Sequence, residues 1–208
     1  MKLISNNLTN GQPVPAAQAF AVIDDTTHVA LSANRNPHLA WLDAPAGTQS
    51  FAIVCYDLDV PSRGDDVNQE GREVPADLPR VDFYHWTLWN IPASVTSIAE
   101  GSQADGVVAR GKSGPDAQGG MQHGLNDYTG WFAGDADMGG DYFGYDGPCP
   151  PWNDALLHRY VFAVHALNVN TLDMQGDYSG ANVRAAIERH SLAKAEIVTT
   201  YTLNPRLA

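Results

Sequence analysis

The chain has 208 residues and a formal net charge of −12, with 24 Asp and Glu against 12 Lys and Arg. Such an acidic surface repels phosphate backbones and anionic bilayers, which argues against nucleic acid and tight membrane docking. The hydrophobic fraction of 44% predicts a globular protein, and 19 Gly with 13 Pro indicate many turns. We therefore expect one domain covering residues 1–208.

The N-terminal residues and the cysteines bear on the cellular compartment of the protein. Residues 1–7 lack the apolar stretch of a signal peptide, and no apolar run is long enough to span a bilayer. We expect a cytoplasmic protein, although a mature form that has lost its leader would look the same. Cys55 and Cys149 lie far apart in the sequence, so we expect both to be free thiols.

Several short runs have the composition of strands. The run 51–56 is continuously apolar, which is typical of a strand buried on both faces. The run 83–91 is aromatic and β-branched and is stopped by Pro92. Further runs at 159–167 and 197–203 complete the set, and weaker candidates lie at 28–32 and 38–42.

One helix is predicted late in the chain, over residues 181–190. Val183, Ala186 and Ile187 recur there at helical spacing, and Ser179 is positioned to cap it. The sum predicts an all-β fold with a helix near the C-terminus.

Two long segments show no regular pattern. Residues 63–82 are polar and acidic, whereas residues 112–147 are rich in Gly and contain several aromatic side chains. Loops this long in a compact domain are usually functional or disordered. The aromatic residues predict that the second segment packs down, either as a self-anchored surface loop or as a lid over a ligand.

Candidate functional residues stand at three places. Asp57 and Asp59 follow an apolar strand, His85 lies within an aromatic strand, and a proline-rich G-P-C-P-P loop at 147–151 precedes His158. Each has a structural interpretation as well: a turn, a hydrogen-bonded core histidine and a stiff connector. Together they could form a metal triad, a Cys149–His158 nucleophile pair or a pocket for an anion. We expect the anion pocket and no metal.

Several short motifs of this chain resemble those of one known protein family and occur in the same order. The segment Asp57 to Pro61 resembles the D-x-D-A-P element of phosphatidylethanolamine-binding proteins. The segment 85–92 is similar to their H-W…W-N-I-P strand, and residues 126–128, 147–151 and 158–160 are similar to their N-D-Y…G-P-C-P-P…H-R-Y signature. The likeness runs from about residue 31 to residue 204 and points to the bacterial Raf-kinase-inhibitor-like branch.

The resemblance implies a fold and a site. The fold is a β sandwich in which a large antiparallel sheet packs on a smaller one, with a helix near the end. The site is a small cavity for phosphate-like or carboxylate groups, without a cofactor, and a cis peptide is expected before Pro61. The implied pocket residues are Asp57, Asp59, His85, Pro150, Pro151, His158 and Tyr160, with Gly147 at the rim.

Departures from the family pattern concern the segments 63–82 and 129–143, which are longer than usual and are expected near the pocket mouth. We expect a ligand-binding or regulatory protein. The alternatives are a small hydrolase, isomerase or cyclase that uses His85, His158 and Asp57 as acid and base, and an inhibitor of a kinase or protease. A homodimer and a protein partner are left open.

Overall fold

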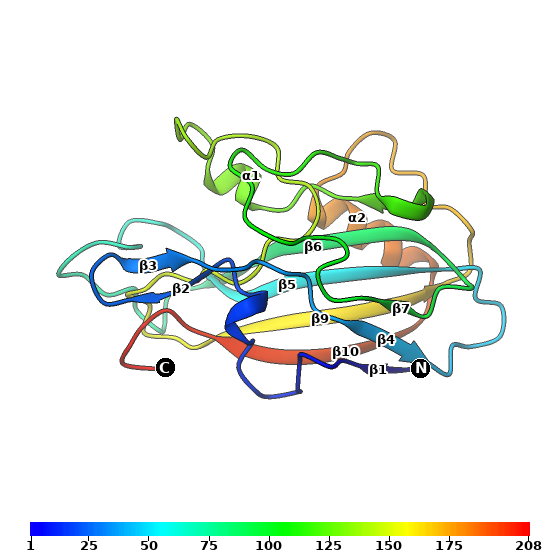
Figure 1. Ribbon diagram of the computed structural model, residues 1–208, viewed down its shortest axis with the longest axis horizontal. Helices are drawn as coiled ribbons and strands as arrows, with labels where there is room; N and C mark the ends of the chain where they lie inside the picture. Colours follow the sequence, from blue (N-terminus) through cyan, green and yellow to red (C-terminus); the bar gives the residue numbers. More distant parts are fainter.

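The computed structural model describes residues 1–208 and is dominated by antiparallel strands (Figure 1). Its large sheet has the order β10-β9-β5-β6-β8, and a three-stranded sheet has the order β1-β4-β7. The remaining strands, β2 and β3, form a separate hairpin. The strands are β1 (Lys2–Ile4), β2 (Ala21–Asp24), β3 (His28–Leu31), β4 (Leu39–Leu42), β5 (Ser50–Pro61), β6 (Arg80–Pro92), β7 (Ser97–Ile98), β8 (Gln122–His123), β9 (His158–Leu167) and β10 (Ser191–Tyr201). The helices are α1 (Tyr128–Trp131) and α2 (Gly180–His190), with short 3₁₀ turns at Ala16–Gln18 and Gln118–Gly120.

The central strand β5 is apolar throughout because both of its faces are covered. Successive side chains of a strand point to opposite faces. Ile53 and Cys55 accordingly join a core of 19 residues that also includes Leu39 and Trp41 of the small sheet. The large sheet therefore packs on the smaller one, as expected.

The opposite face of the sheet is covered by α2. Val54 and Tyr56 of β5 lie in a second core, which holds Val183, Ala186 and Ile187 of the helix. The predicted helix is thus confirmed, within one residue of its expected start. Ser179 occupies the N-cap position but its side chain makes no capping hydrogen bond, so that expectation was wrong.

The four main predicted strands are confirmed in β5, β6, β9 and β10, and the two weaker ones in β3 and β4. The last strand begins at Ser191, directly after the helix, rather than at residue 197. Its first half was missed because it faces solvent on one side and therefore lacks a continuous apolar run.

The Gly-rich segment packs down on the fold, as its aromatic residues predicted. Tyr142 and Tyr145 are fully buried, and Tyr128 and Tyr142 join Phe20 in a third core beside the β2–β3 hairpin. The segment also contains β8 and α1, which the sequence did not indicate.

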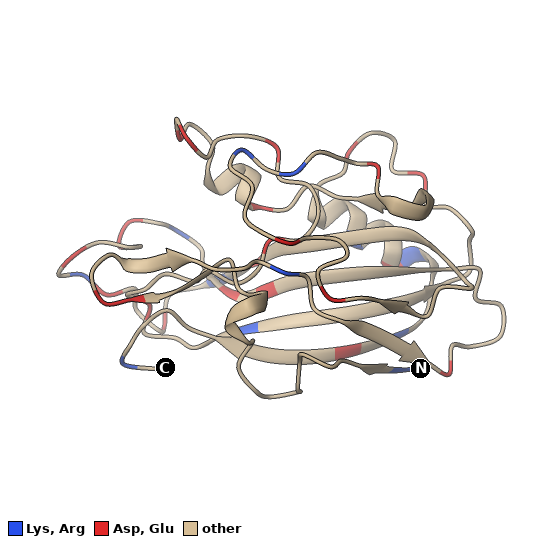
Figure 2. Ribbon diagram, viewed as in Figure 1, with Lys and Arg blue, Asp and Glu red and all other residues tan.

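Acidic positions lie on many of the loops and on some strands of the ribbon (Figure 2). None of the helices combines the length and the apolar character that a bilayer crossing requires. Cys55 is buried, Cys149 is partly buried, and both are free thiols.

Candidate functional site

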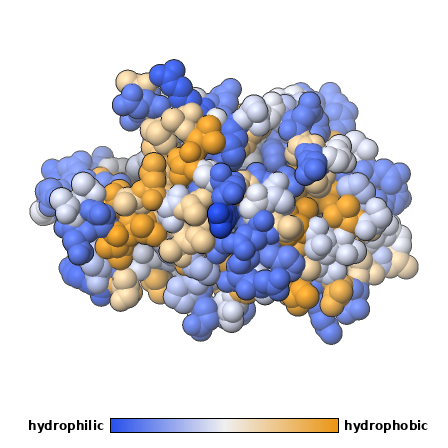
Figure 3. Space-filling model, in the orientation of Figure 1, coloured by the Kyte–Doolittle hydropathy of each residue, from blue (hydrophilic) through white to orange (hydrophobic).

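A cavity of about 420 Å³ opens between the large sheet, the β2–β3 hairpin and α1. The sheet contributes Asp57, His85 and Tyr160, which are almost fully buried and form the inner end of the cavity. The mouth includes Leu31 and Trp131, which are 64% and 49% exposed. Figure 3 shows apolar surface over the hairpin and beside α1. Both long segments reach this mouth, through Gly64, Val67 and Asn68 and through Trp131, Phe132 and Met138.

Sheet register places Asp57 at the inner end. Asp57 of β5 is paired with Tyr160 of β9, so both side chains lie on the same face. The carboxylate Oδ1 accepts the backbone N–H of Asp59 at 2.8 Å. This hydrogen bond is the turn that was one interpretation of the Asp57–Asp59 pair. Asp57 nevertheless also lines the cavity.

Asp59 does not line the cavity. Its carboxylate accepts two hydrogen bonds from the Arg159 guanidinium, each at 2.8 Å, and one from the Arg159 backbone N–H at 2.9 Å. Burial opposes its charge, but these bonds outweigh burial and lower the pKa of Asp59. Residues i and i+2 of a regular strand lie on one side of it, whereas here a β-bulge between residues 57 and 60 sends the two carboxylates to different partners.

His158 lies behind the cavity wall and is fully buried. Its Nδ1 donates to Asp57 Oδ2 at 2.7 Å and its Nε2 donates to Asp154 Oδ2 at 3.0 Å. A ring that donates from both nitrogens is an imidazolium. Burial disfavours this charge, but the two carboxylates outweigh burial and raise the pKa of His158 to about 9. His158 was predicted as a ligand donor, but neither of its N–H groups is free.

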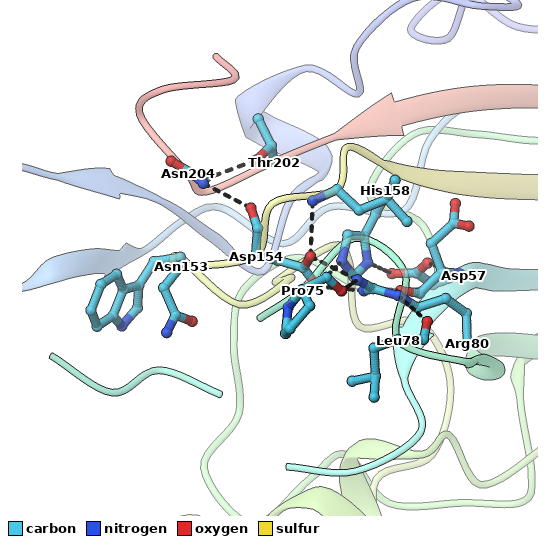
Figure 4. Close-up of polar contacts among 12 residues, drawn as sticks. Asp57, Pro75, Leu78, Arg80, Asn153, Asp154, His158, Thr202 and Asn204 are labelled. Carbon is cyan, nitrogen blue, oxygen red and sulfur yellow. Dashed lines mark hydrogen bonds and ion pairs between the residues drawn. The ribbon is translucent and has the colours of Figure 1, made fainter. Parts of the chain in front are cut away.

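Arg80 extends this buried chain of charges (Figure 4). Its guanidinium binds Asp154 with two bonds of 2.6 and 3.0 Å and also donates to the carbonyls of Asp59, Pro75 and Leu78. Two carboxylates and two cations therefore alternate from the loop to the cavity wall. Sequence reasoning missed Arg80 and Asp154. The spacing of Asp154 and His158 was the one available signal, and it is weak outside a helix.

His85 reaches the cavity because of an irregularity in β6. Cys55 pairs with Trp86 and Tyr56 with Tyr84, so His85 is the extra residue of a β-bulge. Bulges re-aim side chains next to functional sites. Its Nδ1 donates to the carbonyl of Asp146 at 2.8 Å, which leaves Nε2 without a protein partner. Burial lowers the pKa of His85, although Asp57 partly opposes that shift.

Tyr160 completes the inner end. Its ring meets the His85 ring edge-on at 5.3 Å between centroids. Its hydroxyl is buried close to the Asp57 carboxylate but makes no hydrogen bond of normal geometry within the protein. Burial and the neighbouring negative charge both raise the pKa of this phenol well above its usual value.

Of the proline-rich loop, Pro150 and Pro151 line the cavity together with Cys149. Gly147 does not lie at the rim. A Cβ at Gly147 would be 2.1 Å from the carbonyl oxygen of Gln18, so this glycine permits the close approach of two backbones.

One other expectation was wrong, and one of the alternatives left open does not hold. The peptide before Pro61 is trans, and the only cis peptide joins Gly114 to Pro115. The Cys149–His158 nucleophile pair does not form, since both His158 nitrogens bind carboxylates. Burial also raises the pKa of Cys149 to about 12.

The fold and this cavity define a class of protein, a β fold of two packed antiparallel sheets with a ligand-sized pocket on the large sheet. Residues 4–202 match the family model described as phosphatidylethanolamine-binding protein. The chain belongs to this family.

Several relatives are bacterial. The chain is 34% identical to UPF0098 protein YbhB of Escherichia coli over 97% of this chain and 100% of that protein. It is 28% identical to UPF0098 protein YbcL of the same organism, over 97% of this chain and 87% of that protein. The crystal structure of Escherichia coli YbcL, described as a new member of the mammalian PEBP family, superposes with a TM-score of 0.68 at 27% identity, covering 97% of both chains. A putative phosphatidylethanolamine-binding protein homologue from Chlamydia trachomatis gives a TM-score of 0.59 at 25% identity, covering 96% of this chain and 95% of that one.

Proposed function

We propose that this protein binds a small ligand through an anionic group, phosphate-like or carboxylate, at the inner end of the cavity. The observation that carries the proposal is the Tyr160 hydroxyl, which is buried at the cavity wall without a partner. A buried donor left unpaired costs about 1–3 kcal/mol. A ligand oxygen that accepts from this hydroxyl removes that cost.

The charges around this end are balanced. Asp57 alone would repel an anion, but the His158 imidazolium lies 2.7 Å from its carboxylate. Arg80 offsets Asp154 in the same way. The charges of these four groups sum to zero, so the inner end repels an anion less than the acidic surface around it does.

His85 supplies the second donor once it is protonated. Its Nδ1 is held by the Asp146 carbonyl, so a proton taken up from solvent goes to the free Nε2. An anion next to Nε2 favours this imidazolium and raises its pKa. Anion binding is then coupled to proton uptake, and affinity increases as the pH falls below the usual histidine range.

The same geometry favours binding over acid–base catalysis. An enzyme that used His85, His158 and Asp57 would need more than one accessible proton carrier, whereas His158 is sealed behind the wall with both N–H groups engaged. A regulatory, kinase-inhibitor-like role follows from the family resemblance alone, and pull-down from the cell's own extract tests it.

Calorimetry with phosphate, phosphoethanolamine and acetate between pH 5.5 and 8 tests the proposal. We expect His85→Ala to weaken phosphate binding by about 1.5–3 kcal/mol, the usual size of a charge-assisted hydrogen bond, and to flatten the pH dependence. His190→Ala is the matched control, because His190 ends α2 and does not line the cavity. Equal affinities and equal pH profiles for wild type and His85→Ala would show that the assignment is wrong.

A further inference from the structure

The cavity is larger than an anionic group requires. Its volume of about 420 Å³ holds about fourteen non-hydrogen atoms, at about 30 Å³ for each water-sized group. A phosphate or carboxylate group fills less than half of that space. The ligand therefore has a second part, and the lining beyond the inner end determines what that part is.

The lining changes character from the inner end to the mouth. Of the 20 residues that line the cavity 13 are hydrophobic, and its three hydrogen-bonding groups at the inner end belong to Asp57, His85 and Tyr160. The apolar wall beyond them comes from the hairpin, from the segment 60–67 and from the region of α1: Phe20, Val29, Leu31, Val60, Val67, Trp131, Phe132 and Met138. Apolar surface of this kind gains free energy when it is covered by an apolar group.

This apolar wall is built in advance. Phe20 stacks on Tyr128 at 4.7 Å between ring centroids, and Tyr128 stacks on Phe132 at 5.6 Å. Tyr128 is itself fixed by a hydrogen bond of 2.8 Å from its hydroxyl to the Gly147 carbonyl. A wall of interlocked rings loses little conformational freedom when a ligand binds.

We propose that the ligand is a single-chain amphiphile, whose anionic group meets Tyr160 and His85 and whose one short alkyl or aryl group lies against the apolar wall. The inference rests on the proposed function for the head of the ligand and extends it to the tail. The volume left beside a phosphate head of five non-hydrogen atoms accommodates about nine carbons, at about 30 Å³ for each group. Two long acyl chains do not fit inside, so the cavity selects a monomeric amphiphile over a membrane phospholipid.

A homologous series measures this directly. Calorimetry at pH 6 compares inorganic phosphate with methyl, butyl, hexyl, octyl and dodecyl phosphate, each below its micelle concentration. Each buried methylene contributes about 0.8 kcal/mol, so affinity should rise about fourfold per carbon and level off near octyl phosphate. A series that is flat while inorganic phosphate still binds would overturn this inference and leave the proposed anion site intact.

Leu31→Ser and Leu42→Ser form a matched pair of variants. Both leucines end short strands and are exposed, by 64% and 52% respectively, but only Leu31 lines the cavity. We expect Leu31→Ser to weaken octyl phosphate about three- to tenfold and to leave inorganic phosphate unchanged. Leu42→Ser should leave both affinities unchanged. Equal octyl phosphate affinities for the two variants would contradict the assignment of the apolar wall.

Two further probes separate the head from the tail. Octanol that binds as tightly as octyl phosphate would support the apolar wall and overturn the anion site. Co-sedimentation with phosphatidylethanolamine vesicles that is abolished by octyl phosphate would overturn the limit to a single chain.

Discussion

At the scale of single residues, the polar end of the cavity combines groups that are satisfied with groups that are not. His158 and Asp57 are fully engaged with each other, whereas the Tyr160 hydroxyl and His85 Nε2 have no partner in the protein. Buried polar groups are nearly always hydrogen-bonded, so exceptions at a cavity wall indicate where a ligand binds.

Tyr160→Phe separates binding from stability. The change removes a hydroxyl that makes no hydrogen bond and keeps a ring that packs in the core. We expect the free energy of unfolding to rise by about 1 kcal/mol, since a desolvated group without a partner is lost. Phosphate affinity should fall about tenfold, since the ligand loses a neutral donor. Urea unfolding and calorimetry on the same preparation measure both, and a loss of stability with unchanged affinity would argue against a ligand role for this hydroxyl.

Sequence motifs predicted the residues of the inner end but not their roles. Asp57, His85 and Tyr160 were expected in the pocket and lie in the cavity wall, while Asp59 and His158 lie outside it. The bulge at His85 and the second carboxylate on His158 depend on register and on a partner from a loop. The bulge leaves no pattern in the sequence, and the i, i+4 spacing of Asp154 and His158 is a weak signal outside a helix.

At the scale of elements, strands with a continuous apolar run were predictable because both of their faces are buried. The β2–β3 hairpin was half missed, although Asp24 accepts hydrogen bonds from the backbones of Thr26 and Thr27 and makes a recognisable turn. That hairpin contributes Val29 and Leu31 of the predicted strand β3 to the apolar wall, and the missed strand β2 adds only Ala21 to the cavity lining.

The segment 63–79 has no regular structure and depends on Asn153 for its shape. The Asn153 amide donates to the carbonyls of Asp66, Gln69 and Arg72 at 2.8, 3.3 and 3.2 Å, and its Oδ1 accepts the backbone N–H of Asn68 at 2.9 Å. A backbone stretch that would otherwise hydrogen-bond to water is thereby ordered at the cavity mouth.

Asn153→Ala should loosen this segment without unfolding the sheet. Each lost hydrogen bond is worth about 1 kcal/mol, so amide exchange at residues 64–74 should accelerate about tenfold or more. Exchange in β5 and β9 should not change. Asn168→Ala is the control, because its side chain hydrogen-bonds only to the partly buried His190. Unchanged exchange in the segment would mean that its order comes from elsewhere, such as the hydrogen bond of 3.1 Å from the Trp152 backbone N–H to Asn68 Oδ1.

At the scale of the whole molecule, three buried histidines make the free energy of unfolding depend on pH, two of them in one direction and the third in the other. Burial lowers the pKa of His123 and of His165 to about 4. Their neutral forms therefore contribute stability that is present above pH 6.5 and is lost as the pH falls through about 4. His158 behaves in the opposite way, because it is buried as a cation between two carboxylates.

His158 should make the protein less stable in mild alkali. Its pKa is about 9 in the folded state and about 6.5 in the unfolded chain, so the folded state holds the proton more tightly. The resulting stability is fully present below pH 6.5 and is lost as the pH rises through 9, by an amount of roughly 3 kcal/mol. The buried phenols of Tyr128 and Tyr160 do not contribute in this window, because burial raises their pKa well above the usual value. The urea concentration at the unfolding midpoint should therefore fall as the pH rises from 6.5 to 9.5. This pH dependence should be weaker in His158→Gln and unchanged in the control His38→Gln. If the His158 variant does not fold, the NMR titration of the His158 Cε1 proton in the wild type decides the matter, and a pKa below 7 would refute the buried imidazolium.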